Sequence, residues 1–197
     1  MKRFRTLGMF SAITLVLSCI FLTAATAQVK FRSEDLVVKV KGTSSLHDWE
    51  IKSSKGKVEA VLVLGPNYKI TGVSGLRFTV ESESLKSGHN MMDNNTYKAL
   101  KTNTHENISF VLSSANITQI DANTYLLKCV GNMTIAGTTR ETDLVAQCKV
   151  NSDGTFTCSG SKNIKMTDFN IKPPTAMMGT VKTGNDISIA YNLKIVK

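Results

Sequence analysis

The most constraining feature of the sequence is an alternation of apolar and polar residues with a period of two. In the final segment Ile187, Ile189, Tyr191, Leu193 and Ile195 alternate with polar or small residues, which is typical of a β-strand with one apolar face. Segments of this strand character recur along the chain, most of them separated by Gly, Asn, Asp or Pro. There are eight of them, at about 34–43, 48–64, 70–82, 106–117, 124–136, 139–150, 155–166 and 185–196.

The short spacing between these segments predicts antiparallel neighbours, because a parallel pair needs a crossover of about a dozen residues or more. Eight antiparallel strands without a layer of long helices predict an all-β fold, a closed up-and-down barrel with no free sheet edges. A β-sandwich fits the same pattern, since periodicity does not show closure.

Two stretches interrupt the strand pattern. Residues 88–105 are predicted to hold a short helix, since Met92, Thr96, Ala99 and Leu100 lie near helical spacing. Residues 167–184 contain two adjacent prolines and predict a long irregular connection. We expect both stretches to cover an end of the barrel.

The first 27 residues have the features of a secretory signal peptide. Lys2, Arg3 and Arg5 precede an uncharged apolar run from residue 7 to residue 22, and Ala25-Thr26-Ala27 offers small residues for cleavage. A retained membrane anchor is the alternative, although the apolar run is shorter than the roughly 20 residues of a spanning helix. We therefore expect residues 28–197 to be one exported domain, periplasmic or, alternatively, extracellular.

Charge and motifs exclude several classes of function. The formal charge is +9, but no run of five Lys or Arg and no basic patch with interleaved aromatics occurs, so nucleic-acid binding is not predicted. Weak attraction to an anionic membrane surface remains open. His47, His89 and His105 lack metal-ligand spacing, and no nucleophile motif, phosphate-binding loop or acid–base pair is present. The sequence predicts no catalytic residues, no metal and no cofactor, and it leaves the oligomeric state open.

Three cysteines follow the predicted signal peptide. Cys148 and Cys158 flank the turn signal Asn151-Ser152-Asp153-Gly154, so a hairpin centred near residue 153 would place them directly opposite each other. We predict a disulfide between them and a free thiol at Cys129. The alternative is that all three are small core residues.

A few residues are candidates for contacts at a barrel mouth. The single Trp49 stands with His47 and Asp48 after the first strand segment. The alternative is a corner in which Trp49 covers the end of the core and Asp48 or Ser45 bonds to turn amides. Methionine adapts to irregular apolar ligands, so the methionines of the two irregular stretches are further candidates for the mouth. These are Met91, Met92, Met177 and Met178.

Several segments, taken in order, resemble the YceI-like family of exported lipid-binding proteins, in the version found in Bacteroidetes-type bacteria. The resemblance spans nearly the whole of residues 28–197. It departs at Thr104-His105-Glu106-Asn107, where the family usually has Tyr-Pro before an Ile-x-Phe strand. The matching segments are Gly42-Thr43-Ser44-Ser45-Leu46-His47-Asp48-Trp49, Ser84-Leu85-Lys86-Ser87-Gly88, residues 92–101, Ile108-Ser109-Phe110, residues 131–140, and residues 165–174 through Gly179.

The resemblance implies a lipocalin-like, eight-stranded barrel whose elongated apolar cavity binds a polyisoprenoid or isoprenoid quinone chain, in a periplasmic protein without enzymatic activity. A filled-core module that binds another envelope protein through Trp49 and residues 166–179 is the alternative function. Under the first hypothesis the inward faces of the strands line the cavity. The residues expected there are Phe78, Val80, Phe110, Leu112, Met133, Leu144, Ile187, Ile189 and Leu193.

Overall fold

A computed structural model describes residues 26–197, so all of the predicted signal peptide except Thr26 and Ala27 lies outside the described part. The described residues form ten β-strands, one α-helix and four short 3-10 helices. The strands are β1 (Ala27–Ser44), β2 (Trp49–Ser53), β3 (Gly56–Leu64), β4 (Ile70–Glu81), β5 (Asn107–Gln119), β6 (Thr124–Ile135), β7 (Thr138–Val150), β8 (Phe156–Lys165), β9 (Thr175–Ala176) and β10 (Val181–Val196). The helices are η1 (Pro66–Tyr68), η2 (Ser82–Ser84), α1 (Asn90–Leu100), η3 (Met166–Phe169) and η4 (Met177–Gly179).

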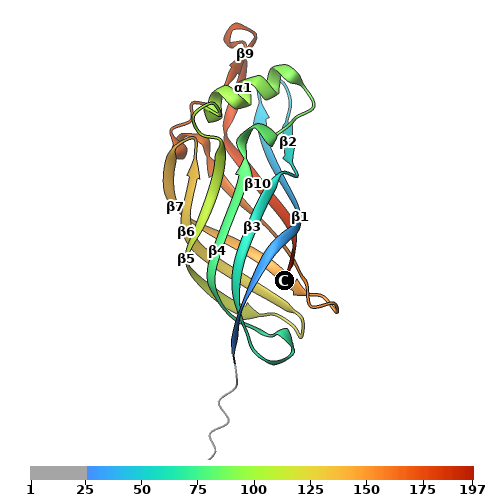
Figure 1. Cartoon of the computed structure of the whole chain (residues 1–197). Coiled ribbons are helices and arrows are strands. Elements are labelled where there is room, and N and C mark those ends of the chain that lie inside the picture. Colours follow the sequence, from blue (N-terminus) through green and yellow to red (C-terminus); the bar gives the residue numbers. More distant parts are fainter. Residues whose placement is uncertain (1–25) are drawn as a thin grey trace, which may run out of the picture.

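The strands close into an antiparallel barrel (Figure 1), as predicted. Neighbours pair in the order β1-β3-β4-β5-β6-β7-β8-β10, and a long ladder between β10 and β1 joins the two ends of the sheet. This last ladder excludes an open sandwich. β2 and β3 both pair with β1 and keep one register along it, from Gly42↔Trp49 to Ala27↔Leu64. They therefore act as one interrupted strand, and the barrel is eight-stranded.

The first strand is longer than the sequence pattern predicts. β1 begins at Ala27, seven residues before the expected start at residue 34. A register shift between Ser33 and Asp35 moves the buried set from Phe31 to Leu36 and Val38. Such a bulge changes which parity faces the core, so a strict period of two does not continue through it.

One end of the barrel is covered and the other is packed shut. Helix α1, predicted within residues 88–105, crosses one end, and β9 lies at the same end (Figure 1). At the opposite end the rings of Phe31 and Phe156 meet edge to face, 5.1 Å between centroids. Phe156 is fully buried and Tyr125 nearly so. These aromatic residues form a floor, so access to the interior is at the α1 end.

The cysteines lie as the predicted hairpin places them. Cys148 of β7 is directly opposite Cys158 of β8, their Cα atoms are 4.1 Å apart, and a disulfide joins them. Cys129 of β6 is a buried free thiol. The turn of the β7–β8 hairpin is held by Asp153, whose carboxylate accepts hydrogen bonds from the Thr155 amide and hydroxyl.

We predict that breaking this disulfide lowers stability without opening the barrel. Closing a loop of about ten residues stabilises a fold by about 2–3 kcal/mol, chiefly through the unfolded state. Urea unfolding with and without dithiothreitol should show this difference, and the Cys148→Ala/Cys158→Ala variant should not respond to the reductant. An unfolding midpoint of the unsubstituted protein that is insensitive to reductant contradicts the disulfide. In urea without reductant, iodoacetamide should modify Cys129 but neither Cys148 nor Cys158.

Candidate ligand cavity

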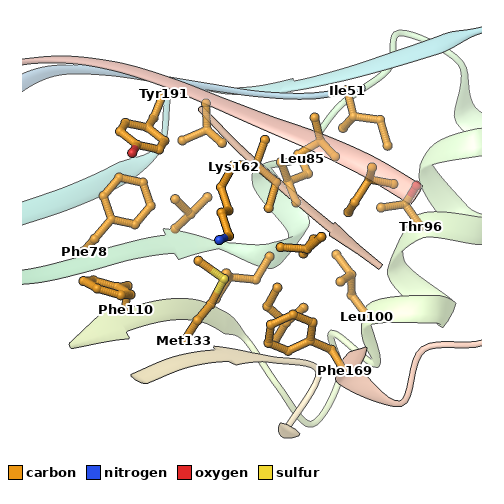
Figure 2. Close-up of a pocket in the computed structure, with 18 of the residues that line it drawn as sticks. Ile51, Phe78, Leu85, Thr96, Leu100, Phe110, Met133, Lys162, Phe169 and Tyr191 are labelled. Atoms are coloured by element: carbon orange, nitrogen blue, oxygen red, sulfur yellow. The ribbon is translucent and has the colours of Figure 1, made fainter. Parts of the chain in front are cut away.

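The barrel encloses an internal cavity of about 580 Å³. This volume lies within the roughly 300–1,000 Å³ of small-molecule sites. Its wall is made mostly of the inward-facing apolar residues of the strands, several of which Figure 2 shows pointing into the space. The filled core of the alternative hypothesis is therefore not observed.

Most of the residues expected to line the cavity do so. They come from β4, β5, β6 and β7, which are consecutive in the wall, and from β10. The eight lining residues are Phe78, Val80, Phe110, Met133, Leu144, Ile187, Ile189 and Leu193.

Leu112 is the exception, since it packs against the core without lining the cavity. The ladder from β5 to β4 ends at Val111, and the β5–β6 register shifts just after Leu112. The Phe110 ring lies over Gly131, the residue opposite Leu112, so close that a Cβ there would be 2.7 Å from it. Phe110 therefore occupies the interior where a regular strand would place Leu112.

The mouth lies between the β1–β2 turn, the start of α1 and the η4 segment. His47, Trp49, Met92 and Met177 line the cavity there, as expected. Met178 does not line it, because its side chain is fully exposed. The chain turns back on itself at η4, where Met177 and Met178 both have positive φ, and this directs the two side chains differently.

Trp49 lines the mouth of the cavity and also packs against the core. Its indole Nε1 donates to the Thr43 carbonyl at 3.0 Å, and its ring packs on Gly42, where any Cβ would clash. The turn amides of Leu46 and His47 are bonded by the Ser44 hydroxyl, not by Ser45 or Asp48 as expected. Ser45 instead accepts from the Lys182 amide of β10, which ties the turn to the neighbouring strand.

Helix α1 presents its apolar side to the cavity. Met92, Thr96, Ala99 and Leu100 all line the cavity, so the helical spacing of the sequence marks the face of a lid. Tyr97 anchors the lid by donating its hydroxyl to the Glu83 carbonyl at 2.9 Å.

Asp93 is the second anchor of α1. Its buried carboxylate accepts from the amide and the hydroxyl of Ser87, at 2.7 and 2.6 Å. Burial raises the pKa of Asp93, but the hydrogen bonds from Ser87 and the charge of Lys86 outweigh it and leave the pKa below its usual range. The ionised carboxylate therefore holds the loop before α1 against the helix.

The sequence analysis did not assign several polar side chains of the strand wall to the cavity, and three of them, Cys129, Tyr191 and Lys162, are ionisable. Burial raises the pKa of Cys129 to about 11 and that of Tyr191 to about 12, so both are neutral at physiological pH. The third, Lys162, is the one lysine, arginine or carboxylate among the described residues that line the cavity. The sequence did contain a signal that Lys162 faces inward, because it has the same parity in its strand as Phe156 and Cys158.

The described part of the chain shows no other type of site. Among residues 26–197, no group of three or more His, Cys, Asp or Glu is placed to hold a metal ion. Within the same residues, no helix is long and apolar enough to cross a membrane.

Comparison with known proteins shows a family match and several similar structures. The model of a family described as the YceI-like domain matches residues 21–195. BcnA of Burkholderia cenocepacia has a similar structure, with 20% identity and a TM-score of 0.61 over 81% of this chain and 96% of that chain. A domain from Saccharophagus degradans, described as polyisoprenoid binding and implicated in plant cell wall breakdown, shares 8% identity, with a TM-score of 0.63 over 84% and 97%. The YCEI protein of Campylobacter jejuni shares 18% identity, with a TM-score of 0.52 over 98% and 97%.

At these identities the structural likeness is one of fold alone. No protein of curated function matches the sequence.

We predict that Asp93→Asn loosens the lid in a pH-dependent way. Replacing a charge-assisted hydrogen bond by a neutral one costs about 1 kcal/mol at neutral pH. Because the native pKa is lowered, the contribution of Asp93 is complete above the ordinary carboxyl pKa of about 3.9 and is lost as the pH falls through the native value. Urea unfolding should thus show a difference between variant and parent that shrinks toward about pH 3. A difference in the free energy of unfolding that is the same at neutral pH and at about pH 3 contradicts this role. An equal difference produced by Asp48→Asn, at the exposed β1–β2 turn, contradicts it as well.

Proposed function

We propose a function for this chain on the premise that it belongs to the YceI-like family, as the match over residues 21–195 shows. The protein holds a polyisoprenoid or isoprenoid quinone chain in its barrel, for storage or transport. The single observation that carries the proposal is the apolar cavity of about 580 Å³, closed at the floor and accessible past α1. The structural neighbour from Saccharophagus degradans, described as a polyisoprenoid-binding domain, supports the same ligand class.

The energetics of such binding need no catalytic group. A linear isoprenoid that buries several hundred Å² of apolar surface gains on the order of 10 kcal/mol gross, at about 25 cal/mol per Å². Association and ordering costs reduce this gain. Specificity then depends on the length of the cavity and on a few polar contacts. A carrier without enzymatic activity is the role that this wall supports.

Export to the periplasm is part of the proposal. It is supported by the signal-peptide features of residues 1–27 and by the Cys148–Cys158 disulfide, since disulfides persist in oxidising compartments. A water-soluble carrier is useful in an aqueous compartment between membranes, because a free isoprenoid chain does not dissolve there. Release into the medium is the alternative destination.

We further propose that the mouth rests on a membrane surface while the ligand is loaded. Leu46, Met91 and Met177 line the cavity yet are 68, 71 and 70% exposed, and Met178 beside them is fully exposed. Exposed apolar side chains gathered at one rim mark an interaction site. Lys182, next to this rim in β10, suits anionic lipid head groups.

We predict that the protein exported by a bacterial host and purified without detergent carries its ligand. Native mass spectrometry should show a stoichiometric adduct, and lipid extraction of the same sample should yield a chain with the repeating mass of isoprene units. A bare mass that persists after incubation with quinones and prenyl lipids would falsify the carrier proposal.

A charge in the cavity should abolish this loading. Ile189→Lys places an unpaired ammonium against the apolar wall, where desolvation is costly. Asn192→Lys adds the same group to an exposed position of the same strand and should load normally. Native mass spectrometry of both variants, with circular dichroism to establish folding, makes the comparison. Normal loading of folded Ile189→Lys counts against ligand binding in the barrel.

The rim makes a separate prediction for membrane contact. Each buried apolar side chain contributes about 1–2 kcal/mol, so Leu46→Ser/Met177→Ser should weaken binding to phosphatidylcholine–phosphatidylglycerol vesicles by about tenfold or more. Ile120→Ser, at an exposed apolar residue just beyond the other end of β5, is the matched control. Co-sedimentation is the measurement. Equal binding by the rim variant and its control contradicts the proposed contact.

A further inference from the structure

A single lysine interrupts the apolar wall of the cavity. Lys162 lies on the inward face of β8, directly opposite Ile189 of β10. Figure 2 shows it among the lining side chains, in the same region of the cavity as Phe78 and Met133. Only 25% of its side chain is exposed, whereas Lys165, three residues further on the same strand and facing outward, is 55% exposed.

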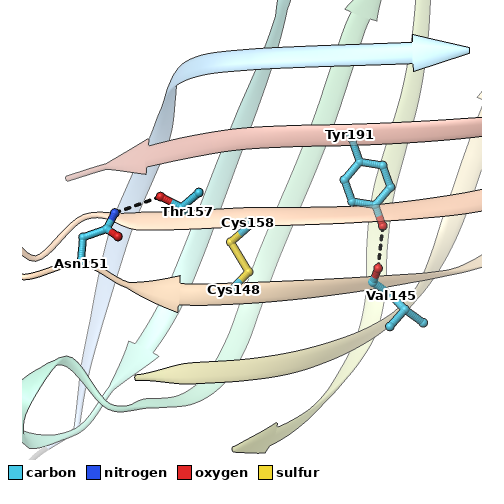
Figure 3. Close-up of a disulfide and its surroundings, with 6 residues drawn as sticks. All are labelled: Val145, Cys148, Asn151, Thr157, Cys158 and Tyr191. Carbon is cyan, nitrogen blue, oxygen red and sulfur yellow. Dashed lines mark hydrogen bonds between the residues drawn. A yellow bond between two sulfur atoms is a disulfide. The ribbon is translucent and has the colours of Figure 1, made fainter. Parts of the chain in front are cut away.

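Lys162 reaches its partner through a seam in the barrel wall. The β7–β8 ladder runs only from Val150↔Phe156 to Ala146↔Gly160, although both strands continue toward the mouth. Side chains bridge the unpaired part. Tyr191 crosses over Gly160 and donates to the Val145 carbonyl at 3.0 Å (Figure 3). Beyond it, the Lys162 ammonium meets the Asp143 carboxylate at 2.5 Å.

The ion pair with Asp143 satisfies only one of the hydrogen-bond donors of the Lys162 ammonium. The ammonium has three N–H donors, and among residues 26–197 Asp143 is the single acceptor that it contacts. Asp143 is 66% exposed and lies on the outer side of the wall. A lysine at an inward position costs desolvation that methionine or leucine would avoid. A ligand that was hydrocarbon throughout would gain nothing from it.

We propose that Lys162 contacts the polar end of the ligand, and that this ligand is an isoprenoid lipid with an uncharged oxygen acceptor, such as a quinone carbonyl or a prenyl alcohol. The inference rests on the proposed function and specifies its ligand. Asp143 already neutralises the ammonium, so an acceptor without charge completes the site, whereas an anionic head group would compete with Asp143. The wall on both sides of Lys162, from Leu144 to Ile189, is apolar and contacts the isoprenoid chain of the ligand.

The test compares two isoprenoid probes, one with and one without an oxygen acceptor, on the exported, delipidated protein. One is a prenylated quinone and the other is squalene, an isoprenoid hydrocarbon without oxygen. We expect the parent protein to prefer the quinone by about tenfold, the value of one net hydrogen bond to a charged donor. Lys162→Met keeps most of the length of the side chain and removes the donor. It should weaken quinone binding about tenfold and leave squalene binding unchanged.

Lys165→Met is the matched control, because Lys165 also forms an ion pair, with Asp186 at 2.7 Å, but faces away from the cavity. It should change neither affinity. If Lys162→Met leaves the ratio of quinone to squalene affinity as it is in the parent, the inference is overturned and Lys162 only bridges the seam. If neither probe binds the parent protein, the carrier function itself fails, which is a distinct result.

A second variant tests the charge of the head group independently. Asp143→Asn removes the competing carboxylate and should increase binding of a prenyl monophosphate, while the parent protein should bind the quinone more tightly than this phosphate. A parent protein that prefers the phosphate overturns the assignment of an uncharged head group. An Asp143→Asn variant with unchanged phosphate affinity overturns the role of the Lys162–Asp143 pair.

Discussion

The ladder between β1 and β10 is the constraint on which the rest of the structure depends. It joins the first and last strands of the sheet, so most backbone groups of the wall find partners around the barrel, and gaps remain where the β4–β5 and β7–β8 ladders end early. Because the backbone is satisfied within the wall, the interior needs almost no polar groups. Closure therefore permits an apolar interior, and the floor of Phe31, Tyr125 and Phe156 packs one end of it shut.

The barrel departs from regular pairing in several places, and three of these departures affect the cavity. The bulge in β1 places Val38 and Val40 on the cavity wall, although Phe31, at odd spacing from them, is also inside the barrel. The shift in β5 lets Phe110 displace Leu112 from the wall. The early end of the β7–β8 ladder opens the seam that Tyr191 and Lys162 bridge. Irregular pairing thus determines which side chains meet the cavity, while regular pairing provides the enclosure.

The lid is held by polar contacts at its edge and by apolar contacts beneath it. Asp93 and Tyr97 attach α1 to the segment between β4 and the helix, while Met92, Ala99 and Leu100 face the cavity. Little of the barrel wall has to move for a ligand to pass such a lid, since the strands are fixed by their ladders. The exposed apolar rim beside it is consistent with loading from a lipid surface, because the ligand then need not cross water.

The sequence by itself determined the strands, their antiparallel order, the lid helix and the opposition of Cys148 and Cys158, because these depend on period two, on helical spacing and on turn residues, which are local properties. Of the nine cavity residues that the same periodicity predicted, eight line the cavity. Closure, the position of Leu112, the exposure of Met178 and the pairing of Lys162 with Asp143 were decided only by the tertiary structure. Closure depends on the β1–β10 ladder, and the positions of Leu112 and Lys162 depend on where a strand loses or shifts its ladder, so residues far apart in the chain set them together. The exposure of Met178 depends on the backbone turn at η4.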